Sequence, residues 1–150
     1  MTGRKQKYRP ASGDKPLPDS SIQTSVSKVR VLVVDDDEKI LRFIGSSLRL
    51  AGYDVSAATS GEEALQMLES NKPQIMVLDI LMPVMDGFDV LQKLRTVSKL
   101  PVITISAHSS AAEKALDLGA NAFLAKPFRP DELIKKIDAI VDHKGKQAAG

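Results

Sequence analysis

The sequence predicts an α/β domain in which a five-stranded parallel β-sheet is covered by helices on both faces. Five short apolar runs, rich in β-branched residues, recur along the chain, and segments with the apolar spacing of amphipathic helices separate them. The runs are almost continuously apolar rather than alternating, as expected for strands that are buried on both faces. Strict alternation of strands and helices calls for right-handed βαβ crossovers, which place the helices over a parallel sheet.

The size and composition of the chain suit one domain of this kind. Its 150 residues are enough to bury a core, and contents of 43% hydrophobic and 27% charged residues are ordinary for a globular protein. The predicted strands are Val29–Val34, Val55–Ala58, Ile75–Leu78, Val102–Ile105 and Ala122–Ala125.

The predicted helices begin and end at recognisable residues. In the first helix, apolar side chains recur at i, i+4, i+8 and i+11 from Ile40, and Gly52 follows as a stop. The second and fourth helices open with the spacing of a capping box. The boundary residues are Ser60 with Glu63 for the second helix, Pro101 after the third, Ser110 with Glu113 and Gly119 around the fourth, and Pro130 at the start of the fifth, which runs to Val141.

Both ends of the chain differ from this pattern. Residues 1–28 contain six basic and two acidic groups and few apolar side chains, so we expect a disordered basic extension. The domain is expected to occupy residues 29–142, and residues 143–150 to form a polar tail. No apolar run is long enough to span a membrane, and the chain has no cysteine, which fits a reducing, cytoplasmic location.

Polar side chains stand at the ends of several predicted strands. Asp35 and Asp36 follow the first strand, Asp79 the third, Ser106 the fourth and Lys126 the fifth. In open α/β sheets, ligands bind outside the carboxyl ends of the strands. We therefore expect these groups to meet at one edge of the sheet.

This set of groups suits phosphoryl transfer. Clustered carboxylates repel one another unless a cation intervenes, and Mg²⁺ suits one or two carboxylates together with a phosphate. An aspartate beside such an ion can attack phosphorus, while Lys126 and Ser106 supply donors for the phosphoryl oxygens. Taken singly, each residue has a structural explanation as a cap, a turn residue or a surface group. Their joint position at one edge favours the chemical interpretation.

At these residues the chain resembles the receiver domain of two-component response regulators, including the chemotaxis regulators. The matching segments are Val31–Asp36, Val77–Pro83, Asp86–Gly87, Ser106–Ala107 and Ala125–Phe128. The resemblance covers roughly residues 29–141. It implies a flavodoxin-like doubly wound (βα)5 fold with strand order 2-1-3-4-5.

The resemblance also implies a role for each site residue. Asp79 is similar to the phosphoacceptor of the family, Asp36 to the direct metal ligand, and Asp35 to a ligand acting partly through water. The backbone carbonyl of Leu81 completes the Mg²⁺ coordination, and Mn²⁺ could substitute. The remaining implied roles are phosphoryl binding and switching at Ser106, Ala107 and Lys126, an aromatic switch at Phe123, and a cis peptide bond before Pro127.

The implied function is a phosphorylation-dependent switch. The phosphoryl donor would be a phosphohistidine on a sensor histidine kinase or histidine phosphotransfer protein. Phosphorylation would then shift the face formed by the fourth helix, the fifth strand and the fifth helix, which binds an unknown downstream protein. We expect no direct nucleic-acid binding by this domain and no membrane contact. The domain would be a monomer or a phosphorylation-dependent dimer.

Some residues depart from common patterns of the family. Ala120–Ala122 replaces acidic residues that form a salt-bridged dimer in one DNA-binding subfamily, and Phe123 replaces a frequent tyrosine. Leu81 cannot hold an attacking water, so we expect a long-lived phosphoryl group. Two alternatives remain open: a phosphate-independent protein-binding module, and a Mg²⁺-dependent aspartyl phosphohydrolase. The hydrolase would need an acid/base aspartate at position 81.

Overall fold

The computed structural model describes the backbone of residues 27–149 and the side chains as far as residue 142. The predicted disordered extension, residues 1–28, lies almost wholly outside these residues. Strands and helices alternate along the described chain. The elements are β1 (Arg30–Val34), α2 (Glu38–Leu50), β2 (Asp54–Ala58), α3 (Gly61–Asn71), β3 (Ile75–Asp79), α4 (Gly87–Arg95), β4 (Val102–Ser106), α5 (Ala111–Asp117), β5 (Ala122–Ala125) and α6 (Pro130–Ala149).

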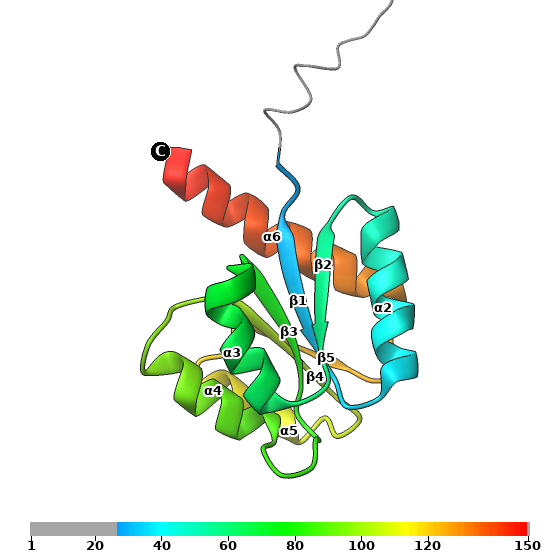
Figure 1. Cartoon of the computed structure of the whole chain (residues 1–150), viewed down its shortest axis with the longest axis vertical. Coiled ribbons are helices and arrows are strands. Elements are labelled where there is room, and N and C mark those ends of the chain that lie inside the picture. Colours follow the sequence, from blue (N-terminus) through cyan, green and yellow to red (C-terminus); the bar gives the residue numbers. More distant parts are fainter. Residues whose placement is uncertain (1–26, 150) are drawn as a thin grey trace, which may run out of the picture.

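The five strands form one parallel sheet in the order β2-β1-β3-β4-β5. This confirms the flavodoxin-like doubly wound fold. Helices α2 and α6 cover one face of the sheet, and α3, α4 and α5 cover the other (Figure 1). Each face has its own apolar cluster, because successive strand residues point to opposite sides. Leu32 and Leu78 pack under α3 and α4, whereas Val33 and Val77 pack under α2 and α6.

The expectation that all five strands are buried on both faces is wrong for the two edge strands. Every residue of β3 and β4 is buried, whereas Asp54 and Ala57 of β2 and Ala125 of β5 are exposed. An edge strand has a neighbour on one side only, so its apolar side chains are covered less completely.

The predicted helix starts are confirmed in part. The Ser60 hydroxyl accepts a hydrogen bond from Glu63 N at 3.1 Å, but the Glu63 carboxylate accepts from Thr59 N rather than from Ser60 N. The capping box predicted at Ser110 is wrong. Among the described residues Ser110 makes no side-chain cap, because its backbone is already helical (φ −65°, ψ −15°) and its hydroxyl is not presented to the first turn.

A capping box that we did not predict opens α4. The Asp86 carboxylate accepts from Asp89 N at 2.9 Å, and the Asp89 carboxylate accepts from Asp86 N at 3.2 Å. The expected glycine stops are confirmed, since Gly52 and Gly119 have φ of +99° and +108°. Backbone angles of this kind are left-handed, and glycine adopts them without a steric penalty.

The last helix is longer than predicted. It runs to Ala149, so the residues expected to form a polar tail continue the helical backbone. Lysine, glutamine and alanine dominate this segment and are good helix formers, so the helix needs no buried face to continue. None of the described helices is both long enough and apolar enough to cross a membrane.

Candidate functional site

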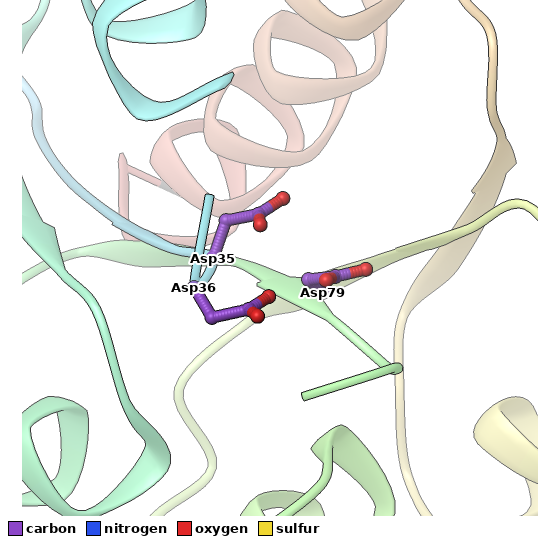
Figure 2. Close-up of side chains that lie close together, drawn as sticks. All are labelled: Asp35, Asp36 and Asp79. Atoms are coloured by element: carbon purple, nitrogen blue, oxygen red, sulfur yellow. The ribbon is translucent and has the colours of Figure 1, made fainter. Parts of the chain in front are cut away.

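The strand register brings two aspartates to the same level of the sheet. Val34 in β1 pairs with Leu78 in β3, so Asp35 and Asp79 occupy adjacent positions at the carboxyl edge. Both are almost fully buried, with exposed fractions of 1% and 3%. Asp36 follows Asp35 and is exposed. Figure 2 shows the three carboxylates gathered where β1 and β3 end.

These three carboxylates could share one cation. Each offers an oxygen atom, and the three oxygens lie within 4.8 Å of one another. Hard oxygen donors at this spacing fit Mg²⁺, which binds proteins through a few carboxylates and keeps several waters. The carboxylates together carry more negative charge than one lysine can neutralise. The residues present therefore fit the ion that the sequence implies.

Lys126 provides the positive charge of the site. It directly follows β5, and its ammonium lies 3.2 Å from Oδ2 of Asp35 and 3.3 Å from Oδ1 of Asp79. The Lys126–Pro127 peptide bond is cis, the conformation that the resemblance implied. One cation thus bridges two buried carboxylates that come from different strands.

Burial controls the charge balance of this cluster. Burial and then the charge of Asp35 raise the pKa of Asp79 to about 6, although Lys126 opposes the shift. Burial also raises the pKa of Asp35, against the hydrogen bond that its carboxylate accepts from Asp37 N. Burial lowers the pKa of Lys126, but Asp79 and Asp35 outweigh it, so the net shift is upward. A lysine held charged beside two costly carboxylates is prepared to bind additional anionic oxygens.

Ser106 is the last residue of β4 and is completely buried. Its hydroxyl accepts a hydrogen bond from His108 N at 3.1 Å, and its carbonyl accepts one from Lys126 N at 2.8 Å. Ser106 therefore connects the loop before α5 with the lysine of the site. Ala107, between Ser106 and His108, is exposed.

Two of the predicted residues stand apart from the carboxylate cluster. Phe123 pairs with Thr104 in the sheet and is half-buried in β5. Leu81 lies two residues beyond Asp79, and its side chain is 51% exposed. The three aspartates and Lys126 form the compact centre, and Leu81 and Phe123 flank it at a greater distance along the chain.

Gly87 supports the site in a way that sequence reasoning missed. Its N–H donates to Ile80 O at 2.8 Å, and a Cβ at this position would lie 2.6 Å from the carbonyl oxygen of Asp79. Such an approach is too close for any side chain, so the start of α4 packs directly against the end of β3. The Asp86–Gly87 pair was noted as part of a motif, but its spacing gives no indication of this contact.

An apolar cavity of about 310 Å³ opens beside the cluster. It lies between α2 and the loop that follows β5. Its lining residues are Ile40, Phe43, Ile44, Ala107, Lys126, Pro127 and Phe128. Phe43 is 55% exposed, which is unusual for a large aromatic side chain beside a polar site.

Comparison with known proteins gives a consistent family. Residues 31–138 match the model of the response regulator receiver domain. The transcriptional regulatory protein PrrA of Mycobacterium tuberculosis is 41% identical over 130 residues, which are 85% of this chain and 56% of that protein. A probable transcriptional regulator of Porphyridium aerugineum, ycf27, is 39% identical over 77% of this chain and 49% of its own length. The chain thus spans about half the length of these curated relatives.

Solved structures agree with the sequence matches. The receiver domain of the Francisella response regulator 1452 superposes with a TM-score of 0.74 at 35% identity, covering 78% of this chain and 99% of that one. A CheY-like receiver domain protein from Methanospirillum hungatei gives a TM-score of 0.75 at 30% identity, covering 81% and 99%. With its parallel sheet, its strand-end aspartates and these matches, the chain belongs to the response regulator receiver domain family of two-component signal transduction.

Proposed function

We propose that Asp79 accepts a phosphoryl group from a phosphohistidine on a sensor histidine kinase or histidine phosphotransfer protein. The observation that carries this proposal is a buried Asp79 in contact with Lys126 and beside two further carboxylates. A carboxylate oxygen of Asp79 attacks phosphorus, and the P–N bond breaks. The departing imidazole keeps the bond electrons and takes up a proton, so the histidine leaves neutral.

Asp35, Asp36 and Asp79 would hold Mg²⁺, with the carbonyl of Leu81 as a further ligand. When bound, the ion neutralises charge on the transferring phosphoryl oxygens. Asp36 is exposed and can exchange its water for the ion without structural change, whereas Asp35 is held by Asp37 N and Lys126. This difference supports Asp36 as the direct ligand and Asp35 as the positioning one.

Lys126, Ser106 and Ala107 would hold the phosphoryl group after transfer. The Lys126 ammonium is already placed beside Asp79 Oδ1, so it needs to move little to reach a phosphoryl oxygen. The Ser106 hydroxyl adds a donor, and the backbone N–H of the exposed Ala107 adds another. Together they offset the dianionic charge that phosphorylation introduces.

The output surface would be the face of α5, β5 and α6, which are the predicted fourth helix, fifth strand and fifth helix. Ser106 borders this face because it pairs with Ala125 in β5. Phe123 is half-buried on the same strand and has room to change its exposure. Movement of Ser106 toward the phosphoryl group would favour one arrangement of this face, which then binds a downstream protein.

The family is a phosphoacceptor switch rather than a class of conventional enzymes, and the residues here support that role. A hydrolase of the aspartyl phosphate type needs a carboxylic acid at position 81, where this chain has an exposed leucine. A phosphate-independent module would have no use for Asp36, Asp79 and Lys126 together. The names of the relatives describe transcriptional regulation by those proteins; for this domain we propose a protein partner and no direct contact with nucleic acid.

The proposal is tested by incubating the protein with Mg²⁺ and acetyl phosphate and measuring its intact mass. Wild type gains the mass of one phosphoryl group, and Asp79→Asn gains none. The matched control is Asp54→Asn, which removes an exposed carboxylate at the start of β2 and is expected to label like wild type. Equal labelling of wild type and Asp79→Asn would overturn the proposal.

A further inference from the structure

Arg95 joins the end of α4 to the end of α5. It is the last residue of α4, and its Nε and Nη2 atoms both donate to the carbonyl of Gly119, at 3.1 and 2.8 Å. The same guanidinium donates to Ser98 O at 3.2 Å and to Asn121 Oδ1 at 3.3 Å. Four donor contacts thus fix the chain immediately after α5.

This arginine is half-buried, and no carboxylate pairs with it among the residues that the structure describes. Burial lowers its pKa, which shows that part of its hydration has been lost. The acceptors that replace water are carbonyl oxygens at the carboxyl end of a helix, where the helix dipole is negative. Arg95 therefore acts as a cap on α5 that comes from a neighbouring helix.

The junction is closely packed and anchored to the sheet. A Cβ on Gly119 would lie 2.9 Å from Arg95 Nε, so the guanidinium lies directly on the glycine backbone. Asn121 accepts a hydrogen bond from Val102 N and donates to Val102 O, both at 2.8 Å. Since Val102 begins the buried strand β4, the end of α5 is tied to the core.

The start of α5 has far fewer attachments. Residues 107–110 are all exposed, and Ser110 forms no side-chain cap in the described structure. Ala115 is the one fully buried residue of α5, whose seven residues are all described. The other link to α4, with the Lys114 ammonium 4.4 Å from the Phe88 ring centroid, lies in the last turn of α5. The strong contacts are therefore concentrated at one end.

The free end is also the end that reaches the phosphoryl site. The Ser106 hydroxyl accepts from His108 N, three residues before α5 begins. If Ser106 turns toward a phosphoryl group on Asp79, this hydrogen bond must lengthen or break. The loop before α5 then loses its side-chain link to β4 while the junction at Gly119 is unaffected.

We propose that Arg95 is a positioning residue that makes the carboxyl end of α5 a fixed pivot, so that phosphorylation moves the amino-terminal end of this helix. This inference rests on the proposed function, which supplies the trigger. It assigns a role in switching to a residue on α4 that contacts neither the phosphoryl site nor the exposed surface of α5. The guanidinium is required because a lysine could satisfy one carbonyl but not Gly119, Ser98 and Asn121 together.

The test is hydrogen–deuterium exchange with and without Mg²⁺ and beryllofluoride, an analogue of the phosphoryl group. In wild type, exchange should change at residues 79–82 and 107–113 and stay constant at residues 117–121. In Arg95→Met, residues 117–121 should exchange about tenfold faster and respond to the analogue. Arg42→Met is the matched control, since Arg42 is an exposed arginine on α2, and it should behave as wild type.

The outcomes separate the two proposals. No change at residues 79–82 would mean that the analogue does not bind, which overturns the phosphoacceptor role and the pivot with it. A change there, with residues 107–113 and 117–121 responding equally in wild type, would overturn the pivot alone. So would an Arg95→Met variant whose exchange at residues 117–121 matches wild type. The wild-type comparison is decisive even if Arg95→Met folds poorly.

Discussion

The ammonium of Lys126 lies 3.3 Å from Oδ1 of Asp79, so a cation already contacts the carboxylate that we propose to be phosphorylated. The same ammonium also neutralises Asp35, at 3.2 Å. One positive charge thus serves two buried carboxylates, and the exposed Asp36 adds a third negative charge nearby. The site has excess negative charge in the absence of a metal ion, and this imbalance has measurable consequences for stability.

Asp79→Asn should stabilise the protein at neutral pH when a chelator removes divalent ions. The pKa of Asp79 is about 6 in the folded protein against an ordinary value of 3.8, so the folded state binds the proton more tightly. The free energy of unfolding of wild type therefore falls as pH rises from about 4 to about 6. Removing the carboxylate should recover up to about 3 kcal/mol at pH 7.5. Urea unfolding of both proteins measures the difference.

The sign of this effect depends on pH. Near pH 4 the folded wild type is already protonated at Asp79, so the advantage of Asp79→Asn should disappear. Asp54→Asn removes an exposed carboxylate on the edge strand and should show no comparable dependence. A constant advantage at both pH values would mean that burial of the Asp79 charge is not its cause.

Mg²⁺ should stabilise wild type and lose most of this effect in Asp36→Asn. A ligand that binds only the folded state at 100 times its dissociation constant adds about 2.7 kcal/mol to the free energy of unfolding. Mn²⁺ should act in the same way. Unfolding in urea with increasing Mg²⁺ measures the gain, and Glu38→Gln, which alters an exposed carboxylate on α2, should retain it. A full gain in Asp36→Asn would exclude Asp36 as a ligand.

The positions of the acidic residues could be predicted because parallel strands end at one edge of the sheet. Asp35 and Asp79 follow directly from that rule, since each stands at the end of an apolar run. The double contact of Lys126 could not be predicted, because it depends on the path of the loop after β5. The sequence places the lysine at the correct edge but contains no information on which carboxylates its side chain reaches.

The errors concern features that tertiary packing decides. Ser110 and Glu113 have capping-box spacing, but the backbone at Ser110 is helical and the box does not form. β2 has an apolar composition, yet Asp54 and Ala57 are exposed because the strand lies at an edge. Phe43 lies one position from the predicted apolar stripe of α2. Its exposure becomes meaningful only when the loop after β5 is seen to form a cavity beside it.

Phe43→Ala should slow phosphoryl transfer from a histidine phosphotransfer protein by about tenfold while leaving labelling by acetyl phosphate unchanged. Phe43 is 55% exposed and lines the cavity that Lys126 also borders, so a protein donor that reaches Asp79 would cover it. Acetyl phosphate is too small to need this surface. Leu50→Ala is the control, because Leu50 is 91% exposed at the far end of α2. Equal slowing with both donors would place the defect in the site itself.

Leu81→Asn should shorten the lifetime of the phosphoryl group on Asp79. Leu81 is two residues beyond Asp79 and half-exposed, and its apolar side chain offers no hydrogen bond to a water molecule approaching phosphorus. An amide at this position can orient such a water, and we expect dephosphorylation to accelerate about tenfold. The rate is measured by intact mass after acetyl phosphate is removed. Val84→Asn places the same amide on the same loop at a side chain that is 99% exposed, and it should leave the rate unchanged. If Leu81→Asn loses its phosphoryl group no faster than Val84→Asn, an apolar residue at this position does not determine the lifetime.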